Sequence, residues 1–236
     1  MKIVDQAPSY VRAISPYIPG KPITELARQM GIPVEKIVKL ASNENPLGMS
    51  PKARVAVEAA LAGVERYPDQ FDLIAAIAER HGVAQEQVVL GNGSNDVLDL
   101  AARVFLAPGR SAVFSRHAFA VYPLASMSAG AECLAAPAKN YGHDPAAMLA
   151  AIRGDTHVVW IANPNNPTGN FLPQAEVRAF IEKIPPHICV VLDEAYTEYL
   201  TPADRADTGA WVRDFPTLRV VRTLSKIYGL AGLRGG

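Results

Sequence analysis

The sequence predicts an α/β protein of three layers (αβα), in which helices cover both faces of a mostly parallel β-sheet. Two observations support this fold class. From residue 85 onward, short apolar runs alternate with stretches of helical periodicity, which is the order typical of a parallel sheet. Polar and glycine-rich segments follow several of the apolar runs, where the carboxyl ends of parallel strands would gather a ligand.

The expected elements follow the chain in order. Residues 1–50 read as an irregular arm, rich in Pro and Gly, with one helical stretch at residues 23–30 and a polar loop at residues 42–48. Two amphipathic helices follow, in PKARVAVEAALAGV and FDLIAAIAERHG. Strands are expected in QVVL, SAVFS, ECLAAPA, HVVWIAN, ICVVLDEAY and LRVVRTLS, and further helices in SNDVLDLAARVFLA, AFAVYPLASMSAGA, DPAAMLAAIR and PQAEVRAFIEKI. We therefore expect an arm over residues 1–50 and one large domain over residues 51–236.

Composition narrows the class of partner. The chain has 23 basic and 23 acidic residues, so no net charge favours nucleic acid or a membrane surface, and a small molecule is the expected partner. The sequence shows no secretory leader and no run of eighteen apolar residues, which predicts a cytosolic protein. Cys133 and Cys189 each lie in an apolar run, so we expect two buried free thiols and neither a disulfide framework nor a CxxC metal site.

The most specific motif is TLSKIYGLAGLR near the end of the chain. Lys226 stands at the end of an expected strand, and small residues and glycines around it would let a flat ring approach its amine. Arg234 follows eight residues later. The alternative is a surface lysine before a glycine-rich turn.

This motif resembles the Schiff-base lysine motif of the fold-type I aminotransferases, which use pyridoxal 5′-phosphate (PLP). The resemblance extends over residues 35–236. It implies the large PLP-binding domain of that fold, with the cofactor aldehyde bonded to the amine of Lys226.

Two further motifs match the same family. ANPNNPTG resembles the asparagine loop that places Asn166 beside the phenolic oxygen of the cofactor, and an ordinary Asn/Pro turn is its alternative. VVLDEAYTEY implies that Asp193 pairs with the protonated ring nitrogen and that Tyr196 donates to the phenolic oxygen. A metal site or a solvated strand end is the alternative for this second motif.

The cofactor phosphate needs its own receptor. GNGSNDVL predicts a glycine-rich turn that opens a helix, where free backbone N–H groups and the side chains of Ser94 and Asn95 would bind an anion. A plain strand-to-helix turn is the alternative. The family resemblance adds Thr223 or Ser225, together with Arg234, to the same phosphate.

Two aromatic residues complete the expected site. By resemblance Phe119 stacks on the pyridine ring, although a core position is the alternative. Tyr67 matches a tyrosine that reaches the phosphate of the neighbouring subunit, which implies a homodimer; a surface tyrosine before a Pro turn is the alternative. His117 lies near this group and is expected to be structural.

Within the family, LASNENPLG, RYPDQ, HAFAVYP and SKIYGLAGLRGG most resemble the histidinol-phosphate aminotransferases. That resemblance implies a ping-pong exchange between L-histidinol phosphate and 2-oxoglutarate, giving imidazole-acetol phosphate and L-glutamate in L-histidine biosynthesis. An aromatic or broad-specificity aminotransferase, a phosphothreonine decarboxylase-like PLP enzyme and a non-catalytic PLP-fold module stay open. Family members continue beyond this point into a smaller C-terminal domain, so we expect either a fragment of a longer protein or a truncated product.

Overall fold

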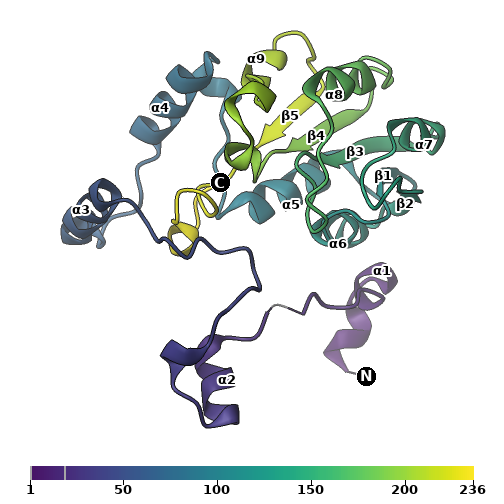
Figure 1. Cartoon of the computed structure of the whole chain (residues 1–236). Helices are drawn as coiled ribbons and strands as arrows, with labels where there is room; N and C mark the ends of the chain where they lie inside the picture. Colours follow the sequence, from purple (N-terminus) through teal and green to yellow (C-terminus); the bar gives the residue numbers. More distant parts are fainter. Residues whose placement is uncertain (1, 19) are drawn as a thin grey trace.

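The sheet is the centre of the molecule. The computed structural model describes residues 2–18 and 20–236, and within them five parallel strands form one sheet in the order β2-β1-β3-β4-β5. The strands are β1 (Ser111–Ser115), β2 (Glu132–Ala136), β3 (Thr156–Ala162), β4 (Cys189–Asp193) and β5 (Leu218–Val221). Helices lie on both faces of this sheet, so the α/β three-layer prediction is confirmed (Figure 1).

The helices are α1 (Ser9–Arg12), α2 (Ile23–Met30), α3 (Pro51–Ala60), α4 (Phe71–His81), α5 (Ser94–Phe105), α6 (Val121–Ser128), α7 (Pro145–Ala150), α8 (Gln174–Ile181) and α9 (Thr208–Trp211). The helices α2 to α8 follow the predicted order, whereas α1 and α9 were not predicted. Figure 1 shows α2, in purple, away from the three layers, whereas α1 lies next to α6. None of the helices in the described part of the chain has the length and apolar character that a bilayer crossing requires.

Side chains of the central strands point alternately to the two faces of the sheet, and each face carries its own hydrophobic core. On one face of the sheet, Val158 and Trp160 of β3 pack with Leu98 of α5 and Tyr122 of α6. On the other face, side chains of β3 pack with α7 and α8, because successive residues of a strand point to opposite sides. Both faces are buried, which is why HVVWIA reads as a continuous apolar run.

Three local predictions need correction. The run QVVL forms no strand, because no described strand lies beside it; only an isolated antiparallel bridge joins Asn92 to Gly235. Cys189 is buried as expected, but Cys133 is only half-buried because β2 is an edge strand of the sheet. The arm also contains the short helix α1 in addition to the expected α2.

Candidate functional site

Neighbouring strands bring the predicted residues to one edge of the sheet. Ala162, at the end of β3, pairs with Asp193, and Asp193 pairs with Val221 of β5. The loop that carries Asn166 therefore begins beside Asp193, and the segment that carries Lys226 begins on the other side of it. This is the carboxyl edge of the parallel sheet, where α/β proteins bind ligands.

Asp193 is a buried carboxylate with fixed partners. Its side chain is 5% exposed. Tyr122 donates a hydroxyl hydrogen bond to Oδ2 at 2.8 Å, and the N–H of Ala195 donates to Oδ1 at 3.1 Å. Burial raises the pKa of Asp193, while these two hydrogen bonds and the charge of Lys226 act to lower it. A cationic partner at this carboxylate would favour its ionised form.

Tyr196 is the point where three chain segments meet. Its hydroxyl oxygen accepts from Asn166 Nδ2 at 3.3 Å and from Asn43 Nδ2 at 3.0 Å. Burial raises the pKa of Tyr196, so the hydroxyl stays protonated at neutral pH and keeps a hydrogen to donate. Asn166 and Tyr196 thus lie close enough to hold one oxygen atom of a ligand between them.

Lys226 lies over the ring of Tyr196. Its Nζ is 5.6 Å from the ring centroid and donates to the carbonyl oxygen of Ser42 at 3.1 Å. Burial lowers the pKa of Lys226, and the charges of Glu44 and Asp193 oppose that shift. A lowered pKa increases the fraction of neutral amine, which is the nucleophilic form.

The N-terminus of α5 forms a second part of the site. The backbone of Gly93 has φ 81° and ψ 164°, a conformation almost restricted to glycine, immediately before Ser94 and Asn95. Arg234 lies against it, with Nη2 donating to the carbonyl oxygen of Asn92 at 2.9 Å. A Cβ on Gly93 would collide with the Arg234 guanidinium. This close approach leaves an arginine beside the free N–H groups that begin a helix, which suits an anion.

Thr223 and Ser225 are both buried in the segment before Lys226. The Thr223 hydroxyl donates to the carbonyl oxygen of Gly235 at 3.3 Å and accepts from the N–H of Ser225 at 3.1 Å. These contacts tie the Lys226 segment to the chain just after Arg234. The Thr223 side chain thus connects the segment that precedes Lys226 to the residue that follows Arg234.

The predicted aromatic residues differ in their placement. Phe119 is half-buried, with its ring edge-on to Tyr122 at a centroid distance of 5.7 Å. It therefore lies next to the residue that binds Asp193. Tyr67 is fully exposed, and no contact joins it to the other predicted residues in the described part of the chain. The His117 carbonyl accepts from Asn165, which is a structural contact in the asparagine loop.

Sequence reasoning missed Tyr122 and Asn43, which contact Asp193 and Tyr196. Tyr122 lies on the first turn of α6, and its ring stacks on Trp160 at 5.4 Å with an interplanar angle of 3°. In the sequence, the only indication that Tyr122 belongs to the site is that it lies three residues after Phe119. Asn43 belongs to the polar loop SNENPLG, and its φ of 49° is a left-handed backbone conformation that marks constrained loops.

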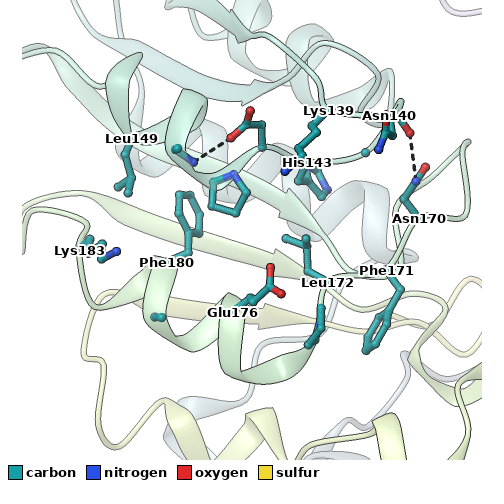
Figure 2. A pocket seen from close by; sticks show the side chains of 16 residues that line it. Lys139, Asn140, His143, Leu149, Asn170, Phe171, Leu172, Glu176, Phe180 and Lys183 are labelled. Atoms are coloured by element: carbon teal, nitrogen blue, oxygen red, sulfur yellow. Dashed lines mark hydrogen bonds between the residues drawn. The ribbon is translucent and has the colours of Figure 1, made fainter.

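A cavity of about 590 Å³ lies elsewhere, between α7 and α8. Figure 2 shows its lining, with Leu149 and Phe180 on facing helices and the Asn170 side chain hydrogen-bonded to the Asn140 carbonyl. His143 borders it; its Nε2 is hydrogen-bonded to the Ala162 carbonyl oxygen at 2.7 Å, and its Nδ1 is buried without a hydrogen-bond partner among the described residues. None of the predicted site residues lines this cavity.

Comparisons with known proteins show the family of the chain. The family model for class I and II aminotransferases matches residues 35–236. A histidinol-phosphate aminotransferase of Dechloromonas aromatica is 76% identical over all of this chain, and one of Nitrosospira multiformis is 59% identical over all of it. The chain spans 65% and 61% of the length of these two relatives.

A solved structure shows the same architecture. The crystal structure of histidinol-phosphate aminotransferase from Sinorhizobium meliloti in complex with pyridoxal-5′-phosphate matches 98% of this chain and 61% of that chain. The TM-score is 0.87 at 28% sequence identity. The parallel sheet with helices on both faces is therefore that of fold-type I aminotransferases. The match over residues 35–236, with these identities, shows that the chain belongs to the class I and II aminotransferase family.

Proposed function

We propose that the protein to which this chain belongs is a PLP-dependent histidinol-phosphate aminotransferase. The reaction is the exchange of an amino group between L-histidinol phosphate and 2-oxoglutarate, giving imidazole-acetol phosphate and L-glutamate in L-histidine biosynthesis. The names of the relatives at 76% and 59% identity support the substrate. The single observation that supports the chemistry most strongly is the meeting of Lys226, Asn166 and Tyr196 beside the buried Asp193.

The residues present fit PLP by their chemistry. The cofactor has an aldehyde, a phenolic oxygen, a ring nitrogen and a phosphate. Lys226 offers an amine with a lowered pKa, Asn166 and Tyr196 offer neutral donors, and Asp193 offers a carboxylate. At Gly93, the N-cap of α5, the Arg234 guanidinium lies so close to the backbone that a Cβ would collide with it, and an arginine beside the free N–H groups of a helix N-terminus suits a phosphate.

Each predicted residue then has a role. Lys226 would bond to the aldehyde carbon, Asp193 would accept from the protonated ring nitrogen, and Phe119 would cover one face of the ring. Asn166 and Tyr196 would donate to the phenolic oxygen. The phosphate would be bound by Ser94, Asn95, Thr223, Ser225 and Arg234. The arginine makes the strongest of these contacts, because charge-assisted hydrogen bonds contribute about 1.5 to 3 kcal/mol each.

Proton transfer is the step that the chain itself performs. When bound, PLP withdraws electrons from the α-carbon of the amino substrate. The Lys226 amine would be the base that takes the proton from that carbon and, once protonated, the acid that gives a proton back. Burial supports this role, because it lowers the pKa of Lys226 toward the pH at which the amine works. Asp193 would lie beside the ring nitrogen, and the hydrogen bond from Tyr122 favours its ionised form by lowering its pKa against the effect of burial.

A second copy of the chain would complete the site. Tyr67 is 100% exposed between α3 and α4, and other large apolar side chains around it are exposed too, namely Leu61, Val64 and Phe71. An exposed apolar surface of this kind suits a protein interface. We propose a homodimer in which Tyr67 reaches the phosphate of the neighbouring subunit, as the family resemblance implies.

Comparing amino donors tests the substrate. The protein with bound PLP is supplied with 2-oxoglutarate, and L-glutamate formation is measured with L-histidinol phosphate, L-phenylalanine or O-phospho-L-threonine. We expect the highest kcat/KM with L-histidinol phosphate. An equal or higher value with phenylalanine would assign an aromatic or broad-specificity aminotransferase, and carbon dioxide release from phosphothreonine would assign a decarboxylase.

Gly93→Ala tests the phosphate site. The Cβ would collide with Arg234, and the backbone conformation at position 93 costs a residue other than glycine about 1 to 3 kcal/mol. We therefore expect the dissociation constant for PLP, measured by fluorescence titration, to rise roughly tenfold or more. Gly154→Ala is the matched control, because nothing lies within 4 Å of its Cβ. Unchanged PLP binding in Gly93→Ala would place the phosphate elsewhere.

A further inference from the structure

A buried ion pair lies behind the site and joins the two segments that carry Asp193 and Lys226. Glu194 follows Asp193 directly and is 1% exposed. Its Oε2 accepts from Arg222 Nη2 at 2.7 Å and from Thr208 Oγ1 at 2.6 Å. Arg222 lies four residues before Lys226. One guanidinium therefore connects the end of β4 to the segment that leads to the lysine.

Arg222 also contacts a second carboxylate. Its Nη1 donates to Glu198 Oε1 at 3.4 Å, and the same oxygen accepts from the Tyr228 hydroxyl at 3.4 Å. Glu194 and Glu198 lie two residues before and two residues after Tyr196. Tyr228 lies two residues after Lys226. The contacts of Arg222 thus flank both the tyrosine and the lysine of the site.

The ion pair between Glu194 and Arg222 lies directly after the last paired residues of β4 and β5. β4 and β5 are neighbours (Figure 1), and their register ends with Asp193 opposite Val221. The N–H of Glu194 makes one more backbone bond, to the Val221 carbonyl at 2.9 Å. Beyond this point the ion pair between the side chains of Glu194 and Arg222 connects the two segments that leave the strands.

We propose that Arg222 is a positioning residue that sets the place of the Lys226 amine relative to Asp193 and Tyr196. The inference rests on the proposed function, since it assigns a role toward the bond between Lys226 and PLP. Arg222 makes no contact with Lys226 itself and acts through Glu194 and Glu198.

The chemistry of the pair supports a geometric role. Burial raises the pKa of Glu194 to about 7, while the charge of Arg222 opposes that shift. Replacing a buried ion pair by apolar groups is often neutral or stabilising, so stability alone does not account for such a pair. A guanidinium can hold two carboxylates through separate N–H groups in one plane, whereas a lysine ammonium is a point charge without that fixed geometry.

Binding of two forms of the cofactor can be compared to distinguish a displaced lysine amine from a general loss of structure in the site. PLP binds through its phosphate, ring and covalent bond to Lys226, whereas pyridoxamine 5′-phosphate cannot form that bond. For Arg222→Lys we expect the dissociation constant for PLP to rise about tenfold or more, because a displaced lysine amine weakens the covalent part of PLP binding, and a tenfold change corresponds to about 1.4 kcal/mol. The dissociation constant for pyridoxamine 5′-phosphate should change by less than about threefold.

A double variant and a control complete the test. Arg222→Met combined with Glu194→Gln removes both charges, so Tm should recover relative to Arg222→Met alone while PLP binding stays weak. Arg178→Lys changes an exposed arginine that pairs with Glu182 and Asp214, and both dissociation constants should stay at parental values.

Three results would overturn the inference. Parental PLP binding in Arg222→Lys would show that the guanidinium geometry is not needed. Equal weakening of both cofactor forms, or recovery of PLP binding together with Tm in the double variant, would show a general structural role. If the parental protein bound neither cofactor form, the proposed function would be wrong as well, which separates its failure from a failure at Arg222 alone.

Discussion

Lys226→Ala is expected to abolish transamination by the protein with added PLP. The amine has two tasks, since it bonds to the cofactor aldehyde and then moves the substrate proton. A positioned acid–base group alone contributes on the order of 10²- to 10⁴-fold to a rate, so we expect kcat to fall by at least that much. The measurement is L-glutamate formation from 2-oxoglutarate with L-histidinol phosphate as the donor.

Lys183→Ala is the matched control for this change. Its side chain borders the cavity between α7 and α8 and belongs to a different part of the molecule (Figure 2). Its kcat should equal the parental value, and both variants should keep the parental Tm. A Lys226→Ala protein that still turned over, or an equal loss in Lys183→Ala, would refute the assignment of the base.

Asp193→Asn is expected to have the second largest effect. Asparagine keeps the shape of the side chain but cannot carry the negative charge that pairs with a protonated ring nitrogen. Breaking a buried charge pair costs about 3 to 5 kcal/mol. That corresponds to a loss of roughly 10²-fold to several thousandfold. We expect the loss in kcat and, in part, in PLP affinity, each measured against the parental protein.

Asp214→Asn serves as its control. Asp214 is an exposed partner of Arg178, and surface ion pairs of this kind contribute about 0 to 1 kcal/mol to stability. Neither kcat nor PLP affinity should change. If Asp193→Asn kept parental kcat and affinity, the ring nitrogen would not face this carboxylate, and the cofactor would have to bind in another orientation.

Periodicity and motif order were enough to predict the fold and the neighbourhood of the site. The strands that end before Asn163 and at Asp193 are apolar runs buried on both faces, and parallel strands bring their carboxyl ends to one edge. Asp193, Asn166 and Lys226 could therefore be expected together without coordinates. The contact between Asn166 and Tyr196 was expected from the family resemblance, which assigns both side chains to the same cofactor oxygen.

Other features depend on contacts between distant segments. Tyr122 donates to Asp193 across 71 residues, and Ser42 accepts from Lys226 across 184 residues. No periodicity encodes such pairs. The failure of QVVL as a strand has a similar cause, because an apolar run becomes a strand only where another strand lies beside it. The half-buried Cys133 likewise depends on the edge position of β2.

Reduction of the protein with borohydride in the presence of PLP is the most direct test of the covalent attachment. The reagent makes the bond between a lysine and the cofactor permanent, and peptide mapping by mass spectrometry then identifies the lysine. We expect the phosphopyridoxyl group on Lys226, in the peptide that contains LSKIYGLAGLR. A label on any other lysine, or an active protein with no label, would contradict the role of Lys226 and with it the assignment of the site.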